Sequence, residues 1–336
     1  MATDKSLPWL LEPDAANPGV RLFALRWLLD RPEDDGEVVD AQADVMRTGP
    51  VPKILAAQDP EGWWEKPGAG YSSKYRGSVW QLIALDRLGA DGTEPRVRLA
   101  CEYVLHHSIN SIGAFGWSGR ATEQAPGPST GIHCLNGNLL AAMIHLGHLD
   151  DERVQRAIEW QALSITGEDP AFPYYKSGTA GPGFRCGSNG GLPCAWGATK
   201  ALRGLLAIPE GRRGAKVDHA LQTGAEFLLA SDPSIADYPK KNRVSDHWFR
   251  FGLPLSYWSD VLETLEVLTA LGYGIDARLD RAFDLVLSKR DESGRWPLED
   301  ALNGRTWAAI ERKGEPSKWV TLRALAVLKA ANRPGS

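Results

Sequence analysis

The sequence contains no cluster of basic residues and no long apolar run. Its 336 residues carry 38 Lys and Arg against 42 Asp and Glu, which gives a net charge of −4. Without a basic stripe, the chain lacks the electrostatic footprint of a nucleic-acid-binding protein. No stretch approaches the roughly 18 apolar residues of a membrane-spanning helix. We therefore expect neither a nucleic-acid partner nor an integral membrane segment.

Cysteine is also scarce, with four residues in the chain. The N-terminal segment is interrupted by proline and lacks the apolar core of a signal peptide. These two features predict a cytoplasmic protein whose thiols are reduced. Reduced cysteines are either small buried residues or metal ligands.

Tryptophan, in contrast, is abundant, with 13 residues. Each tryptophan brings a large apolar surface and one N–H donor, so this excess predicts a large core, an aromatic cavity, or both.

The chain repeats a pair of helices about every 60 residues. Four segments share a small residue, an acidic residue two positions later and then an aromatic residue or leucine, at 100–104, 157–161, 224–228 and 282–286. A more apolar helical segment that ends at glycine or proline precedes each of them, at 79–88, 139–146, 198–208 and 261–271.

A further pair at 20–29 and 38–58, and a last helix at 318–331, extend the series to six inner helices and five clear outer ones. Such pairs either stack into an open solenoid or close into a ring. We prefer the ring, and predict an all-α (α/α)6 toroid that forms one domain over residues 1–336.

Two loops carry a family resemblance. Gln58, Gly62 and Trp64 fit the pattern Gln-x-x-x-Gly-x-Trp, and the loop from Arg290 to Trp296 fits it with arginine in place of glutamine. This resembles the repeat of squalene–hopene and oxidosqualene cyclases, which protein prenyltransferase β-subunits share in weaker form. The resemblance implies a terpenoid-cyclase and prenyltransferase toroid in which the glutamine caps a neighbouring helix.

The chain is most similar to a bacterial group of short, single-toroid squalene-cyclase-like proteins, through segments 134–139, 252–257 and 316–323. It departs from the bacterial triterpene cyclases because it has no Asp-x-Asp-Asp motif in a suitable place and can build only one barrel. Full squalene cyclisation is therefore not expected.

A ring brings the N-termini of its inner helices together at one end, and three cysteines fall there. Cys134 opens the third inner helix, with His133 beside it, and Cys186 and Cys194 precede or open the fourth. These four residues are a candidate zinc site, because a catalytic zinc takes three protein ligands. The resemblance supports zinc, which prenyltransferase β-subunits and lanthionine-forming toroids hold near this mouth. The alternative is that these cysteines are small buried residues.

Four tryptophans lie at the starts of inner helices: Trp80, Trp196, Trp258 and Trp319. A belt of aromatic faces could stabilise cationic intermediates or clamp a flat apolar substrate. The alternative for each of them is core packing.

Asp260 is the candidate catalytic acid or base, because a carboxylate that faces an apolar cavity has a raised pKa. Tyr257 and His247 are the other residues proposed to move protons. The alternative for Asp260 is a helix cap or a salt bridge. Arg76 and Lys318 lie near helix starts, where the dipole disfavours cations, so they could bind an anionic part of the substrate or be solvated at the surface.

These features predict an enzyme that holds a hydrophobic, isoprenoid or aromatic molecule inside the toroid. Zinc at the three cysteines, or Asp260 without metal, would supply the chemistry. A carbohydrate-active toroid is a second hypothesis, although Asp260 has no evident carboxylate partner. A non-catalytic helical scaffold is the third, and it predicts an open superhelix.

Overall fold

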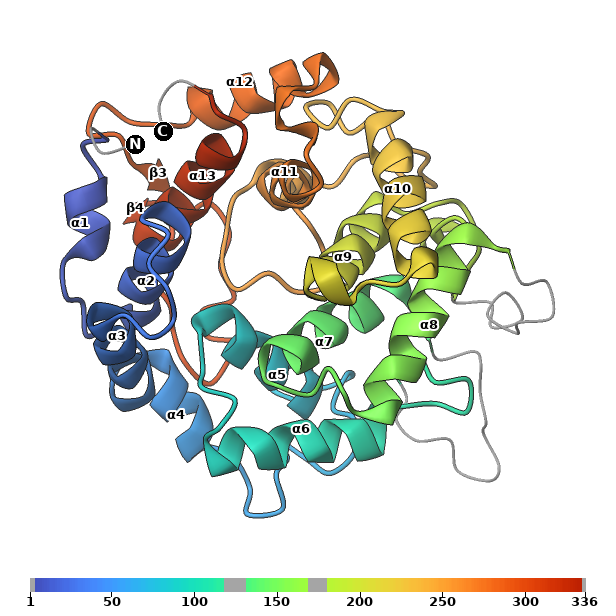
Figure 1. The fold of residues 1–336 in the computed structure, drawn as a ribbon, viewed down its shortest axis with the longest axis horizontal. Coiled ribbons are helices and arrows are strands. Elements are labelled where there is room, and N and C mark those ends of the chain that lie inside the picture. Colours follow the sequence, from blue (N-terminus) through green and yellow to red (C-terminus); the bar gives the residue numbers. More distant parts are fainter. Residues whose placement is uncertain (1–3, 118–130, 169–179, 334–336) are drawn as a thin grey trace.

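A computed structural model describes residues 4–117, 131–168 and 180–333, and it shows a closed ring of helices (Figure 1). The ring confirms the predicted toroid and contradicts the open superhelix that a scaffold would form. Its inner wall is built from α2 (Pro18–Phe23), α5 (Ser78–Leu88), α7 (His133–His145), α9 (Ala195–Leu206), α11 (Val261–Ala270) and α13 (Lys318–Ala330).

The outer wall alternates with the inner one along the chain (Figure 1). It consists of α1 (Leu7–Leu11), α3 (Gly36–Arg47), α4 (Pro50–Ala56), α6 (Pro95–Ser108), α8 (Glu152–Thr166), α10 (Ala215–Leu229) and α12 (Asp280–Ser288). Each of the six inner helices has an outer partner, and α3 and α4 together form one of these partners. Five of the six outer partners lie where the sequence predicted them. The sixth, outside α13, is filled by α1 from the start of the chain.

Burial explains which helices line the ring. In α7, every residue from Leu135 to Ile144 is buried, because the helix has neighbours on all sides. The outer helix α12 buries only Ala282, Phe283 and Val286, which form one apolar stripe. The more apolar member of each predicted pair is therefore the inner one.

The two ends of the chain meet at the closure of the ring (Figure 1). Asp4 pairs with Arg290, and the Ser6 hydroxyl donates to the Gly294 carbonyl at 2.9 Å. The N-terminal segment therefore packs on the loop that precedes α13 and seals the last repeat.

The two glycine–tryptophan loops are equivalent in detail. Trp64 donates its indole N–H to the carbonyl of Ile54 at 2.8 Å, and Trp296 donates to Val286 at 2.7 Å, in both cases ten residues earlier. Gln58 donates to the Arg96 carbonyl in the next outer helix at 3.0 Å. Gln58 therefore links its loop to the next repeat, as the family resemblance implied, but it does not cap α6, whose N-terminus has no side-chain cap.

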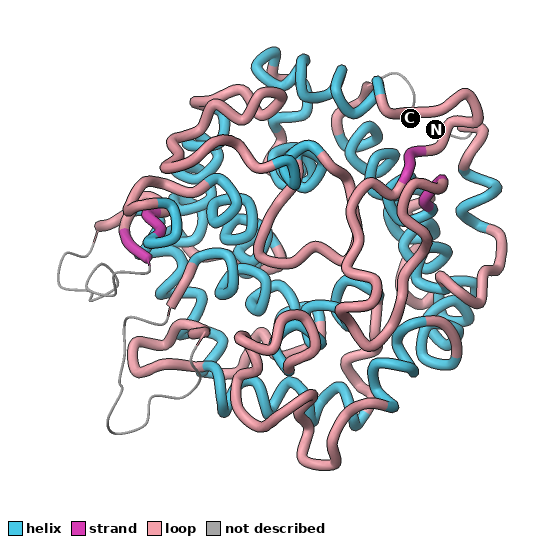
Figure 2. The backbone as a smooth tube through the Cα atoms, turned by 180° about the vertical axis from the view of Figure 1, so that it is seen from behind, coloured by secondary structure: helices cyan, strands magenta, loops and turns pink. Residues whose placement is uncertain are grey.

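Among the residues that the structure describes, four short strands and several loops complete the ring. β1 (Ala180–Gly181) pairs antiparallel with β2 (Arg185–Cys186), and β3 (Trp296–Pro297) pairs antiparallel with β4 (Pro316–Ser317). Loops also run across the opening of the ring (Figure 2). In the parts of the chain that the structure describes, no helix has the length and apolar character needed to cross a membrane.

Candidate functional site

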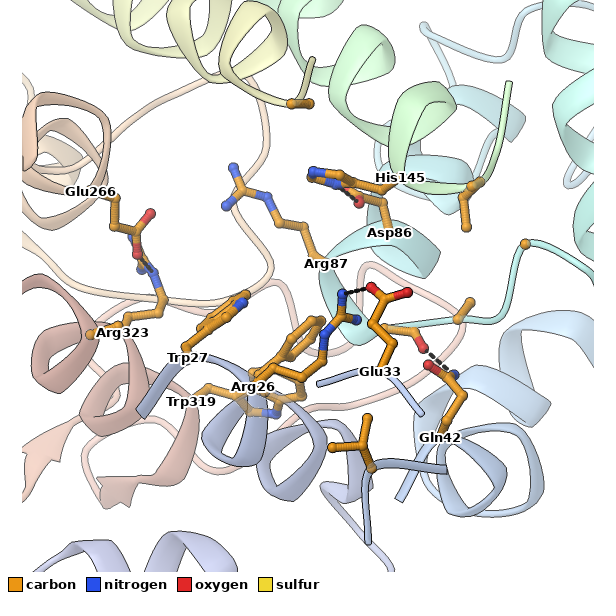
Figure 3. A pocket seen from close by; sticks show the side chains of 18 of the residues that line it. Arg26, Trp27, Glu33, Gln42, Asp86, Arg87, His145, Glu266, Trp319 and Arg323 are labelled. Carbon is orange, nitrogen blue, oxygen red and sulfur yellow. Dashed lines mark hydrogen bonds and ion pairs between the residues drawn. The ribbon is translucent and has the colours of Figure 1, made fainter. Parts of the chain in front are cut away.

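Two cavities lie at opposite ends of the inner helices. The amino-end cavity, of about 480 Å³, is bordered by the first residues of α7 and α9 and by the segments that lead into α5 and α11. The carboxyl-end cavity, of about 1490 Å³, is bordered by the last turns of α5, α7, α9, α11 and α13 (Figure 3). The sequence predicted a site only at the amino ends.

The three cysteines Cys134, Cys186 and Cys194 all line the amino-end cavity. A hairpin brings two of them together. The Cys194 N–H donates to the Phe184 carbonyl at 2.9 Å, and the Cys186 N–H donates to Leu192 at 3.1 Å. This pairing places Cys186 and Cys194 close together on the two strands of the hairpin, at the cavity wall.

The environment of Cys186 favours the thiolate. The neighbouring Cys194 thiol favours the charged form of Cys186, and so do the backbone N–H groups of Asn189 and Ser188 in the turn that Cys186 begins. These donors outweigh burial and lower the pKa of Cys186 to about 6. The same contact raises the pKa of Cys194, which remains the protonated donor.

Cys134 differs from Cys186, because burial raises its pKa to about 12. Among residues 4–117, 131–168 and 180–333, no group of three or more His, Cys, Asp and Glu side chains is arranged to hold a metal ion. The thiols are of the ligand type that zinc prefers, but their present arrangement does not fit the ion.

His133 borders the cavity, yet its ring is not available as the predicted metal ligand. Its Nε2 bonds the Gly181 carbonyl and its Nδ1 bonds the Gln161 amide, both at 3.0 Å. Burial lowers its pKa to about 4, so the ring is neutral at physiological pH. His133 therefore acts as a buried structural contact between α7, α8 and β1.

This buried histidine should make stability depend on pH. Its pKa rises to about 6.5 on unfolding, so the unfolded chain takes up the proton first as the pH falls. We expect a loss of about 2 kcal/mol of unfolding free energy between about pH 7 and about pH 5 from this group alone. Urea unfolding of the wild type and of His133→Gln at both pH values measures it. An equal loss in both proteins would contradict the assignment.

Only one of the four predicted tryptophans lines the amino-end cavity, namely Trp196. Trp80 and Trp258 are buried against Tyr75, with ring centroids at 5.2 and 5.7 Å, which is the core packing left open as the alternative. Trp319 borders the carboxyl-end cavity instead. Trp258 also precedes α11 rather than lying in its first turn.

Asp260 borders neither cavity. It is fully buried, caps α11 by accepting from the Glu263 N–H at 2.6 Å, and pairs with Arg323 at 3.3 Å. Burial raises its pKa, as expected for an enclosed carboxylate. Its geometry is that of the alternative interpretation, a cap and salt bridge, and gives no access to substrate.

The other predicted site residues are divided. Tyr257 lines the amino-end cavity. His247 lies outside it, bonded to Asp300 at 2.5 Å and stacked on Trp258. Arg76 is exposed and lies over the Trp307 ring at 4.7 Å, whereas Lys318 pairs with Asp14 at 3.3 Å. Neither Arg76 nor Lys318 borders either cavity, so their positions do not support a role in binding substrate.

The carboxyl-end cavity contains an ion-pair network that the sequence analysis missed. Asp86 binds His145 at 2.6 Å and Arg203 at 2.7 Å. Although burial opposes ionisation, Arg203 and His145 hold the pKa of Asp86 below its usual range. On α13, Arg323 binds Glu266 at 2.6 Å (Figure 3).

A second part of the network lies behind the cavity wall. Glu263 pairs with Arg87 and, at 2.6 Å, with Lys200, and both Glu263 and Lys200 are fully buried. One feature of the sequence could have indicated this network. Charged residues such as Asp86, Lys200 and Glu263 lie within helical segments whose apolar character predicted that they were inner helices. Such charges are rarely buried unless they are paired.

No family model matches the chain, and no curated protein matches it. Solved structures match the chain at low sequence identity. An unsaturated glucuronyl hydrolase specific for heparin is 10% identical, with 94% of this chain and 84% of that chain covered and a TM-score of 0.49.

The polysaccharide lyase BACCELL_00875 is 12% identical, with coverages of 95% and 89% and a TM-score of 0.49. The type II terpene cyclase MstE from Scytonema is 13% identical, with coverages of 84% and 96% and a TM-score of 0.28. By its own ring of alternating inner and outer helices, the chain is an α/α toroid. Toroids host many reactions, so likeness at this level does not transfer an activity.

Proposed function

We propose that the chain is an enzyme that uses the Cys186 thiolate as a nucleophile toward an electrophilic group on a small, largely apolar molecule. The observation that carries this proposal is that the hairpin brings Cys186 and Cys194 together at the cavity wall, where the Cys194 thiol and the turn that Cys186 begins favour the Cys186 thiolate. A thiolate held in this way at neutral pH is the reactive form of cysteine.

The cavity around the thiolate suits an apolar or aromatic substrate. Phe184, Trp196, Ile132 and Tyr257 supply its apolar surface, and its volume of about 480 Å³ is in the range of small-molecule sites. Lys74 lies exposed at the mouth, with its Nζ 4.4 Å from the centre of the Tyr257 ring. Partial burial lowers the pKa of Lys74, which makes proton donation easier.

The proposed reaction is acyl transfer to water. The Cys186 sulfur forms a bond to the acyl carbon, and the bond from that carbon to its leaving group breaks as the leaving group takes a proton from Lys74. Water then adds to the thioester and releases the acid. A proton from the attacking water returns to Lys74, and Cys186 leaves the acyl carbon as the thiolate.

Turnover of a 4-nitrophenyl ester of an apolar acid tests this proposal. We expect the wild type to carry an acyl adduct on Cys186 in the mass spectrum, and Cys186→Ala to lose both the adduct and turnover. Cys101→Ala is the control, since Cys101 is buried in α6 away from both cavities. Unchanged turnover in Cys186→Ala would overturn the proposal, as would stoichiometric zinc bound by the thiols of the purified protein.

The Cys194 donor makes a separate prediction. Alkylation of Cys186 by iodoacetamide should reach half its maximal rate near pH 6 in the wild type. Cys194→Ala removes the largest stabilising hydrogen bond, so the midpoint should rise by about one unit or more. Cys194→Ser keeps a hydroxyl donor and should restore most of the shift. Peptide mass spectrometry across the pH range measures it, and identical midpoints in all three proteins would contradict it.

A further inference from the structure

The amino-end cavity is bordered by cations that no acid neutralises. Among the described residues that border it are three cations, Lys74, Lys240 and Arg243, and no Asp or Glu. None of the three forms an ion pair within the part of the chain that the structure describes. All three side chains are exposed, so a ligand can reach their charged groups. The cavity is therefore positive, although the chain as a whole carries a net charge of −4.

The carboxyl-end cavity shows the opposite arrangement. Six cations border it, and each pairs with a carboxylate, as Arg203 does with Asp86 and Arg323 does with Glu266. The cations of that cavity are thus neutralised by the protein itself. Those of the amino-end cavity are left to solvent or to a ligand.

Two of the unpaired cations lie in the loop 239–243, which is tied to the hairpin of the proposed nucleophile. Asn189, three residues after Cys186, makes the connection. Its side chain donates to the Pro239 carbonyl at 3.0 Å and accepts from the Lys241 N–H at 3.0 Å. The loop is therefore held beside the turn that Cys186 begins.

The side chains of this loop keep most of their hydrogen-bonding capacity. Lys240 Nζ donates to the Ala236 carbonyl at 3.2 Å, and the Arg243 side chain makes no hydrogen bond with the described residues. A guanidinium group has five N–H donors and an ammonium group has three. Lys74 lies apart from this pair, because its Nζ is over the Tyr257 ring at 4.4 Å and the Tyr71 ring at 4.8 Å.

Two helices add to the positive potential of the cavity. The residues that precede α7 and α9, Ile132 and Cys194, both border it, and neither helix has a side-chain cap at its N-terminus. An uncapped helix N-terminus carries a partial positive charge. Helix dipoles and unpaired cations therefore favour the same sign of ligand charge.

We propose that the substrate of the Cys186 thiolate carries an oxyanion, a carboxylate or a phosphate, at the end of its apolar part away from the acyl carbon, and that Arg243 and Lys240 bind this group. The proposal rests on the proposed function, since it names the substrate class for the same cavity. Arg243 matches an oxyanion in shape and charge, and Lys240 contributes a second positive charge. Lys74 remains available to the leaving group.

Two matched esters test this proposal by turnover. The mono-4-nitrophenyl ester of suberic acid has a free carboxylate at its far end, and 4-nitrophenyl methyl suberate is neutral there. We expect kcat/KM to be at least about ten-fold higher for the acid, mainly through a lower KM, because hydrogen bonds to a charged group are the stronger ones. The advantage should shrink as salt is added. Equal kcat/KM values would overturn this proposal and leave the thiolate proposal standing.

Binding to Cys186→Ala provides a readout that does not depend on catalysis. The probes for isothermal titration calorimetry are hexanoate, hexyl phosphate and 1-hexanol. We expect at least one anion to bind about ten-fold or more tightly than the alcohol, and the tighter anion tells a carboxylate from a phosphate. Equal affinities for all three, or no binding by any of them, would contradict the proposal whether or not the wild type turns over esters.

Variants locate the bound anion. Replacing both Arg243→Gln and Lys240→Gln should abolish the preference for the acid over the neutral ester. Lys241→Gln is the matched control, because Lys241 is an exposed cation of the same loop that does not border the cavity. We expect it to keep the preference. A double variant that keeps the full preference would exclude this loop as the anion site.

Discussion

Replacing Gly137 with alanine should destabilise the protein by about 3 kcal/mol or more, or prevent it from folding. A Cβ at Gly137 would lie 2.1 Å from the Lys200 carbonyl oxygen and 2.6 Å from the Ala201 nitrogen. Both atoms belong to the backbone of α9, so no side chain can move aside. The facing position, Gly204, would place a Cβ 2.6 Å from the Gly137 oxygen. α7 and α9 therefore pack with their backbones in direct contact.

The sign of the change in unfolding free energy shows whether packing or helix propensity determines the effect of Gly137→Ala. Alanine is favoured over glycine in a helix by about 1 kcal/mol, so propensity alone predicts a stabilised variant. Gly36→Ala is the matched control. Gly36 is the first residue of α3, and a Cβ there would meet no atom within 4 Å. We expect it to be neutral or slightly stabilising. Denaturant unfolding of both variants measures the difference, and a Gly137→Ala protein as stable as the wild type would refute the close approach.

Replacing Glu263 with glutamine should cost about 3–5 kcal/mol of unfolding free energy. Glu263 is fully buried and is the shared anion for Lys200 and Arg87. Glutamine keeps the shape but leaves two buried cations without a charged partner. Glu37→Gln is the control, because Glu37 is 54% exposed in its pair with Arg21 and such surface pairs contribute less than about 1 kcal/mol.

The deficit of Glu263→Gln should shrink as the pH rises from about 7 to about 9. Burial already lowers the pKa of Lys200 to about 8, and the loss of its anion lowers it further. Its pKa in the unfolded chain is about 10.4, so the unfolded state holds more protons in this range and stability increases with pH. A deficit that is constant with pH would mean that Lys200 stays charged in the variant.

The ring was predictable because its signals are local and repeated. Apolar periodicity, helix-ending glycines and the Gln58-to-Trp64 loop identified every inner helix, and the parallel course of those helices predicted that Cys134, Cys186 and Cys194 would meet. The contacts of single side chains were not predictable. Trp80 and Trp196 occupy equivalent places in sequence, yet one packs in the core and the other lines a cavity. The difference depends on how neighbouring helices are rotated.

The second cavity was missed for a related reason. Asp86, Arg87 and Arg203 lie late in inner helices, where the helix dipole favours a cation and solvent can hydrate a charge of either sign. The sequence around these residues does not distinguish a helix end that is exposed to solvent from a helix end that the α2 and α3 segments cover. The enclosure is produced by residues more than 40 positions away in the chain, such as Trp27 and Gln42.

The closure of the ring by Asp4 and Ser6 has a consequence for biosynthesis. The segment that completes the wall outside α13 leaves the ribosome among the first residues of the domain, and its binding surface emerges among the last. Until then, the apolar surfaces at the two ends of the incomplete ring are exposed to solvent and to other proteins. The ring therefore cannot close until both the first and the last segments of the domain have been synthesised, and a nascent chain that stalls before α13 exposes apolar surface that chaperones or neighbouring chains can bind.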